Sequence, residues 1–167
     1  GIIFNVDGDK MDFDVLVKKF TRYVEHNLGG KLSNLFTEDG VYDDYIYGPF
    51  EGRENIKTML TKHFHEDAKD MTWEMYDPIY KDGIGYAKYR FSFTSTIPES
   101  LGAKVAIPGM AYFKFEDGLI KYYGEMVNGG IAMVQLNLPA TKIKRVFQKW
   151  ARRTLQSDPI LAKMFSD

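Results

Sequence analysis

Two adjacent acids, Asp43 and Asp44, lie in the aromatic stretch VYDDYIY of residues 41–47. A carboxyl group among apolar side chains can carry protons between carbon atoms, because burial raises its pKa toward neutrality. The stretch alternates as a strand does, so Tyr42 and Asp44 share one face while Asp43 lies on the other. Only one of the two acids can therefore point into a cavity.

Glu125 offers a second carboxyl group, in the strand-like run LIKYYGEMVN of residues 119–128. Alternation groups Glu125 with Lys121 and Tyr123, unless Gly124 marks a bulge that turns these side chains. Two interpretations stay open. Glu125 is either an acid inside a pocket or a solvated side chain paired with a neighbouring lysine.

The run KHFHED, residues 62–67, combines two histidines with two acids and raises the question of a metal site. On a helix, His63 and His65 are two positions apart and do not share a face, and no third ligand is evident. We therefore expect a solvated helix end and no metal. His63 alone stays a candidate for acid–base work, because it could reach a pocket from this helix.

The composition indicates one globular domain over residues 1–167, with 44% hydrophobic and 27% charged residues. Without cysteine, the chain has no disulfides, thiolate metal sites or cysteine nucleophiles. A formal net charge of -1 gives no reason to expect nucleic acid as a partner. No apolar run approaches the ~20 residues that span a bilayer, and the opening GIIFNVDGDKM is unlike a signal peptide. We therefore expect a cytoplasmic protein that binds no membrane.

Helices come first in the chain and strands follow. Apolar residues recur at helical spacing over residues 12–27, KLSNLF reads as a short second helix, and a third helix begins near Gly52. Gly48-Pro49 is expected to break the aromatic strand. After Asp70, four strand-like runs separated by short turns predict an antiparallel meander. This order indicates an α+β fold.

A closing helix is predicted over ATKIKRVFQKWARRTL, residues 140–155, and Asp158-Pro159 starts a last helical turn. Six basic residues and no acid lie from residue 142 to 153, opposite an apolar row of Ile143, Val146, Phe147 and Trp150. Such a helix could bind a membrane surface or nucleic acid. We expect instead that the apolar row packs on its own domain or on a twin subunit, because the chain is otherwise balanced in charge.

Three stretches resemble the nuclear transport factor 2-like superfamily, particularly its SnoaL-like, polyketide-cyclase-like members. NLFTEDGVYDD followed by GPFEGRENI is similar to the family's Phe-x-Glu/Asp-Asp and Gly-Arg-Glu-x-Ile signature. YFKFEDGLIKYYGEMVN is similar to its final hairpin, and VQLNLP to the segment that often follows. Together these stretches span residues from about 34 to 139.

The resemblance implies a cone-shaped, curved, mixed or antiparallel sheet wrapped around N-terminal helices, as in nuclear transport factor 2-like and cystatin-like folds. The core would run from about residue 12 to 139, with a C-terminal helical extension over residues 140–167. The resemblance also implies a deep pocket for a small hydrophobic molecule, no cofactor, and a homodimer. The superfamily includes both enzymes and protein-binding modules, so the fold alone does not decide the function.

The resemblance to ketosteroid isomerase selects one aspartate. Counting from the shared Leu35-Phe36, Asp44 falls at the position of that enzyme's general base. Two structural alternatives for Asp44 stay open: it could accept hydrogen bonds at the turn near Gly48, or it could pair with Arg53.

The isomerase's second feature is missing from the sequence. The position of that enzyme's protonated aspartate holds Ala111, two residues before Phe113, and its tyrosine falls near Phe20. Tyr23, one helical turn further on, could donate instead, or it could be a core residue with its hydroxyl at the rim. Steroid isomerisation by the same apparatus is therefore not expected.

The final hairpin also resembles the phenazine-biosynthesis A/B proteins, in its Glu-Asp-Gly-x-Ile-Lys turn and the glutamate that follows. This resemblance implies that Glu125 acts as an acid in the pocket. The pocket histidine of that family would align with Met59, and His63 lies one turn further along. The condensation chemistry of that family is therefore not implied here.

We expect a cofactor-free isomerase, cyclase or dehydratase that moves protons on a hydrophobic, cyclic or polyketide-like ketone. Asp44 would be the base, Glu125 or His63 the second acid–base group, and tyrosines would donate to the enolate oxygen. The expected substrate-binding residues are Tyr23, Tyr42, Tyr89, Phe20, Met59, Phe91, Ala111 and Phe113. The alternative is a non-catalytic small-molecule-binding or protein-interaction module on the same fold.

Overall fold

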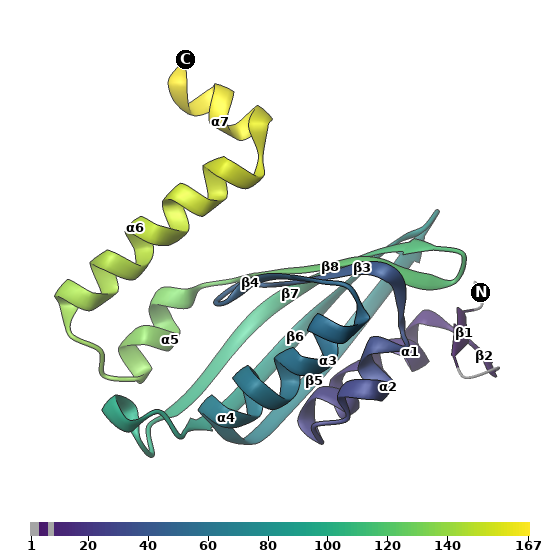
Figure 1. The fold of residues 1–167 in the computed structure, drawn as a ribbon, viewed down its shortest axis with the longest axis horizontal. Coiled ribbons are helices and arrows are strands. Elements are labelled where there is room, and N and C mark those ends of the chain that lie inside the picture. Colours follow the sequence, from purple (N-terminus) through teal and green to yellow (C-terminus); the bar gives the residue numbers. More distant parts are fainter. Residues whose placement is uncertain (1–3, 7–8) are drawn as a thin grey trace. The chain divides into compact units, whose positions relative to one another are not determined.

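The computed structural model describes residues 4–6 and 9–167, and the chain forms two compact units, residues 1–136 and residues 137–167 (Figure 1). The strands of the first unit are β1 (Phe4–Val6), β2 (Asp9–Met11), β3 (Phe36–Asp44), β4 (Gly48–Glu51), β5 (Ala68–Lys81), β6 (Ile84–Ser95), β7 (Lys104–Glu116) and β8 (Leu119–Val127). Its helices are α1 (Phe13–Glu25), α2 (Gly29–Ser33), α3 (Arg53–Met59), α4 (His65–Asp67) and α5 (Gly129–Gln135), with a π-helical turn η1 (Leu60–Phe64) and a 3₁₀ turn η2 (Pro98–Ser100). The second unit holds α6 (Ala140–Ser157) and α7 (Pro159–Ser166).

Six strands form one sheet in the order β4-β3-β8-β7-β6-β5. Strands β5 to β8 pair antiparallel in succession, which confirms the predicted meander, while β3 pairs parallel with β8. Figure 1 shows α1, α2 and α3 against one face of this sheet. The mixed sheet with N-terminal helices on one face is the α+β fold class expected from the sequence.

The sheet curves because its long strands carry bulges. The register of β5 against β6 shifts twice, around Asp70 and around Asp77, and both aspartates have left-handed φ angles of 54° and 52°. An extra residue on one strand bends that strand and increases its twist. The bent strands give the sheet its curvature.

Helix α1 forms because apolar residues recur every three or four positions, and it buries that face against the sheet. The ring of Phe20 lies at its centre, 5.3 Å from the ring of Phe113 and 4.8 Å from that of Tyr123. The next helix, α2, begins with Gly29 and Gly30. A Cβ at Gly29 would lie 2.8 Å from the carbonyl oxygen of Lys57, so glycine here allows α2 to approach α3 closely.

The aromatic strand differs from its prediction at both ends. It begins earlier, at Phe36, and ends at Asp44, and the chain turns over residues 45–47. Gly48-Pro49 does not break the strand but begins β4, which pairs back on β3. This placement is compatible with proline because β4 is at the sheet edge, where a missing N–H costs no ladder hydrogen bond.

Candidate active site

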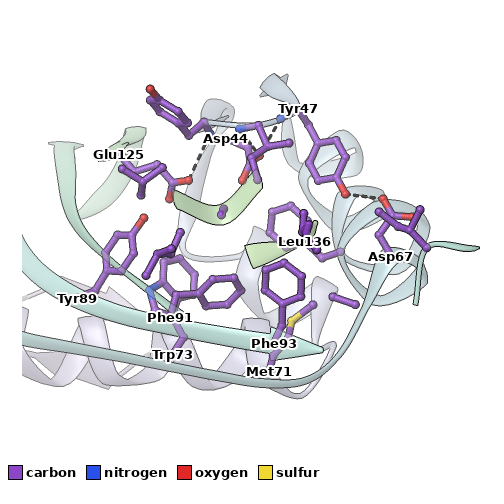
Figure 2. Close-up of a pocket in the computed structure, with 18 residues that line it drawn as sticks. Asp44, Tyr47, Asp67, Met71, Trp73, Tyr89, Phe91, Phe93, Glu125 and Leu136 are labelled. Carbon is purple, nitrogen blue, oxygen red and sulfur yellow. Dashed lines mark hydrogen bonds between the residues drawn. The ribbon is translucent and has the colours of Figure 1, made fainter. Parts of the chain in front are cut away.

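A cavity of about 160 Å³ is lined by the turn after β3, by strands β5 to β8 and by α5 (Figure 2). Aromatic and aliphatic side chains make up most of the lining: Tyr45, Ile46, Phe64, Ala68, Met71, Trp73, Phe91, Phe93, Ile97, Ile107, Val127, Ala132 and Leu136. The remaining lining residues are Asp44, Glu125, Asp67 and two tyrosines, Tyr47 and Tyr89. Figure 2 shows Asp44, Glu125 and Tyr89 together at one end of this lining.

Asp44 is the last residue of β3, and the residue is only 7% exposed. One carboxylate oxygen, Oδ2, accepts hydrogen bonds from the backbone N–H groups of Ile46 at 3.0 Å and Tyr47 at 2.9 Å. Asp44 therefore holds the β3–β4 turn and lines the cavity at once. Donation from two N–H groups favours the ionised carboxylate.

The other alternative for Asp44 was an ion pair with Arg53, and this pair does not form. The guanidinium of Arg53 donates from Nε and Nη2 to the carbonyl oxygen of Phe36, at 3.0 Å and 2.8 Å. Arg53 thus ties the start of α3 to the start of β3. The guanidinium of Arg53 therefore stabilises the fold and does not pair with Asp44.

Asp43 lies on the opposite face of β3, as alternation predicts. It is half-buried, and its Oδ2 accepts a hydrogen bond from the hydroxyl of Tyr122 on β8. Asp43 is not among the residues that line the cavity. The two adjacent aspartates are therefore split between the two faces of the sheet.

Glu125 reaches the same end of the cavity from β8. Its Oε1 accepts a hydrogen bond from the Tyr123 hydroxyl at 2.7 Å, and its Oε2 accepts from the backbone N–H of Tyr45 at 3.3 Å. The register of β8 on β7 is regular through Gly124, and the irregularity falls further back, next to Phe115. Tyr123 and Glu125 therefore share a face.

The environments of the two acids differ. Burial, together with the nearby charge of Asp44, raises the pKa of Glu125 to about 8, although hydrogen bonds from Tyr123, Tyr45 and Tyr89 oppose the shift. Of the two acids, Glu125 is therefore the one whose surroundings favour the protonated form, while two N–H groups donate to Asp44. Two carboxyl groups whose environments separate their proton affinities can act as an acid and a base.

Tyr89 adds a hydroxyl group beside Glu125 (Figure 2). Burial, and then the charges of Glu125 and Asp44, raise the pKa of Tyr89 well above its ordinary value, so it stays a neutral donor. Its ring has room because the facing residue on β7 is Gly109. Gly109 was not predicted as part of the site, although an isolated glycine inside a strand often marks a close approach.

A tyrosine and an aspartate meet at another part of the lining. The hydroxyl of Tyr47 donates to Oδ2 of Asp67 at 2.5 Å, and the Tyr47 ring stacks on Phe64 at 5.8 Å between centroids.

His63 packs against Tyr47, with 5.2 Å between the ring centroids, and against Phe50 at 5.4 Å. His63 is not among the residues that line the cavity. The structure therefore does not bring His63 together with Asp44 and Glu125.

Two of the eight expected substrate-binding residues, Tyr89 and Phe91, line the cavity. The other six are buried outside its lining: Tyr23, Tyr42, Phe20, Met59, Ala111 and Phe113. Strand and helix periodicity give the face of each side chain but not its depth, and these six lie in the packed core. Residues that sequence reasoning missed include Met71 and Trp73 on β5 and Ala132 on α5.

Among residues 11–167, whose side chains the structure describes, no group of three or more His, Asp or Glu side chains is arranged to hold a metal ion. His65, from the KHFHED run, makes a 2.7 Å hydrogen-bond contact through Nε2 with the carbonyl oxygen of Val24. This histidine therefore fastens the end of the helical segment to α1.

The family model described as a SnoaL-like domain matches residues 17–123, from the middle of α1 to β8. The chain belongs to the SnoaL-like family. A comparison with curated proteins finds no match. The SnoaL-like region contains Asp44 and Tyr89, while Glu125 lies two residues beyond the match.

Solved structures share this SnoaL-like fold at low sequence identity. A hypothetical protein with a ketosteroid isomerase-like fold from Catenulispora acidiphila, in complex with trimethylamine, has a TM-score of 0.66 and 16% identity over 75% of this chain and 95% of that chain. A protein assigned as a SnoaL-like polyketide cyclase from Shewanella denitrificans has a TM-score of 0.63 and 16% identity over 74% of this chain and 96% of that chain. An epoxide hydrolase of the LEH-like kind from M. tuberculosis has a TM-score of 0.59 and 12% identity over 72% and 85%. At these identities the likeness extends to the fold alone.

Proposed function

We propose that this SnoaL-like protein is a cofactor-independent enzyme that transfers protons on a hydrophobic, cyclic or polyketide-like ketone. The observation that carries the proposal is that Asp44 and Glu125 lie together at one end of a mostly apolar cavity. In water, an aspartate and a glutamate side chain would ionise over nearly the same pH range. Here backbone donors favour the charged form of Asp44, while burial and the charge of Asp44 favour the neutral form of Glu125.

Each residue then has a role in enolisation. The carboxylate of Asp44 takes a proton from the carbon next to the substrate carbonyl, and negative charge develops on the carbonyl oxygen. Neutral Glu125 and the Tyr89 hydroxyl are the donors for that oxygen, where charge stabilisation is most effective. Return of the proton to another carbon gives isomerisation, attack of the enolate carbon on a second carbonyl gives cyclisation, and loss of a β-hydroxyl group gives dehydration.

The alternative is a binding module without chemistry. Acids and aromatic rings lining one cavity would also suit a small amine, and a structural neighbour was crystallised with trimethylamine. The two functions differ in what they need from Asp44. A general base must exchange a proton with the ligand, whereas a binding site needs only its charge.

The test is exchange of the α-protons of a cyclic ketone such as 2-tetralone in D2O, followed by proton NMR. Asp44→Asn keeps the size of the side chain and removes the base, so exchange should fall by about 100-fold. Asp43→Asn is the matched control, because the same change on the opposite face of β3 should leave exchange unchanged.

Binding of 2-naphthol, a phenol that mimics an enolate, is measured on the same variants. Exchange that is equal in the parent and in Asp44→Asn would reject the proposal. Ligand binding by a parent protein that catalyses no exchange would favour the binding module.

A further inference from the structure

The second unit, residues 137–167, follows the region matched by the SnoaL-like model and carries a charge of its own. It holds seven of the chain's 22 basic residues and two of its 23 acids, a net charge of +5. The other residues therefore hold 15 basic side chains and 21 acids, a net charge of −6. Such an asymmetry within one chain points to an anionic partner for the basic part.

Helix α6 concentrates this charge on one side. At 100° per residue, Arg145, Lys149 and Arg152 fall on the face opposite Ile143 and Trp150. Arg145, Lys149 and Arg152 are exposed, and the 18 residues of the helix contain no acid. No i, i+4 ion pair within α6 can therefore neutralise this basic face.

Helix α7 presents the opposite kind of surface. Asp158 begins it, accepting hydrogen bonds at Oδ1 from the backbone N–H groups of Ile160 and Leu161. Four apolar side chains share one face at helical spacing: Ile160 is 72% exposed, Leu161 37%, Met164 69% and Phe165 79%. An exposed apolar cluster on a short helix costs free energy in water and marks an interaction surface.

In place of the expectation from overall composition that the chain binds no membrane, we propose that residues 137–167 bind the surface of a lipid bilayer that contains anionic lipids. The apolar face of α7 lies among the first carbons of the acyl chains, and the basic face of α6 lies against the headgroups. Neither signal suffices alone, but a basic patch combined with a small apolar insertion gives stable, reversible membrane binding. No helix of the described residues is long and apolar enough to cross a bilayer, so the contact is with the surface.

Two other partners fit these observations less well. Nucleic acid would complement α6, but the face of α7 offers four hydrocarbon or thioether side chains and no hydrogen-bonding group for phosphates or bases. A second copy of the chain exposes apolar side chains at Met110 and Met126 on the outer face of the sheet. Exposed Lys88 accompanies them and would repel α6, while the charge of Arg90 is paired with Glu74 at 3.0 Å.

The proposal does not depend on the chemistry of the cavity, and it is tested by sedimentation of the full chain with vesicles. Vesicles of phosphatidylcholine and phosphatidylserine are compared with vesicles of phosphatidylcholine alone. We expect binding at least about tenfold stronger with phosphatidylserine at about 0.1 M NaCl, and its loss at about 1 M NaCl, where surface charges are screened. Equal binding to the two kinds of vesicle, or none, would overturn the proposal.

Two double variants separate the two signals. Lys149→Glu with Arg152→Glu reverses charges on α6, and Met164→Ser with Phe165→Ser removes the apolar face of α7; each should lower binding by about tenfold or more. The matched controls are Lys62→Glu with Lys69→Glu, and Leu101→Ser, which change exposed residues of the first unit and should leave binding unchanged.

Circular dichroism checks that each variant keeps the helical content of the parent chain. Equal loss of binding in the control variants would contradict the assignment to this unit. Binding to a DNA duplex without binding to vesicles, or self-association that the α7 variant abolishes without any vesicle binding, would also overturn it.

Discussion

The Tyr89 ring occupies the space that a side chain at Gly109 would need. A Cβ at Gly109 would lie 2.2 Å from Cζ of Tyr89 and 2.6 Å from its hydroxyl oxygen. The two residues face each other across β6 and β7. A glycine that contributes no functional group thus fixes where the hydroxyl beside Glu125 lies.

Gly109→Ala should therefore damage the site through Tyr89. The methyl group forces the tyrosine ring away, and we expect a loss of stability of about 1–3 kcal/mol from overpacking. Proton exchange on the ketone should fall by about tenfold or more, because one donor to the developing charge is displaced. Urea unfolding and the NMR exchange assay measure the two effects.

Gly30→Ala is the control for this change. Nothing lies within 4 Å of a Cβ at Gly30, so that variant should be neutral or slightly stabilising in α2. Wild-type exchange in Gly109→Ala would show that the position of Tyr89 does not matter for the reaction.

The stability of the protein should depend on pH through Glu125. Its pKa is about 8 in the folded protein against 4.5 ordinarily, so folding favours the protonated form. This contribution is fully present below about pH 4.5 and is lost as the pH rises through 8. Relative to Glu125→Gln, the parent's free energy of unfolding should decline by up to about 1.4 kcal/mol per pH unit within this window.

Urea unfolding of the parent and of Glu125→Gln at several pH values provides the measurement. The glutamine variant cannot titrate, so the gap between the two curves isolates this one group. Parallel curves from pH 5 to pH 8 would mean that Glu125 is ionised throughout.

The dependence of the proton-exchange rate on pH should also reflect the ionisation of Glu125. An acid with a pKa of about 8 donates a proton below that pH and cannot above it. We expect the exchange rate to fall by about tenfold per unit above pH 8, and Glu125→Gln to remove this limb of the profile while lowering the rate overall. A limb that persists in Glu125→Gln would assign it to another group.

His63 should be dispensable for the reaction. Its ring packs on Tyr47 and Phe50 and does not line the cavity. His63→Gln should leave the exchange rate within about twofold, with a loss of stability below about 1 kcal/mol from the ring contacts. A large fall in the exchange rate would instead place His63 in the active site.

Local patterns predicted the sheet better than they predicted the cavity. The turns at Asp82-Gly83 and Asp117-Gly118, with φ between 50° and 84°, separated the strands correctly because glycine and aspartate tolerate left-handed angles. Alternation also placed Tyr42 and Asp44 on one buried face. It could not show that Tyr42 lies deep, stacked 5.9 Å from Phe20, while Asp44 lies at the end of the strand.

Two residues that line the cavity, Trp73 and Ala132, could not be predicted from local sequence patterns. Trp73 contributes from a bulged strand, and a change of register alters which side chains face inward without leaving a clear trace in the alternation. Ala132 comes from α5, a helix of seven residues whose apolar pattern is too short to define a face. The resemblance to known families supplied Asp44 and Glu125, which periodicity alone could not select.

The parallel pairing of β3 with β8 has a consequence for how the protein acquires its site. The meander of β5 to β8 is built from neighbours in sequence, but the hydrogen bond between Tyr45 and Glu125 joins residues 80 positions apart. Contacts that close such long loops form late in folding, because the chain loses conformational entropy before the contact contributes any stabilising free energy. We expect refolding chains to gain most of their sheet before Asp44 and Glu125 meet, so activity should return with the slowest folding phase.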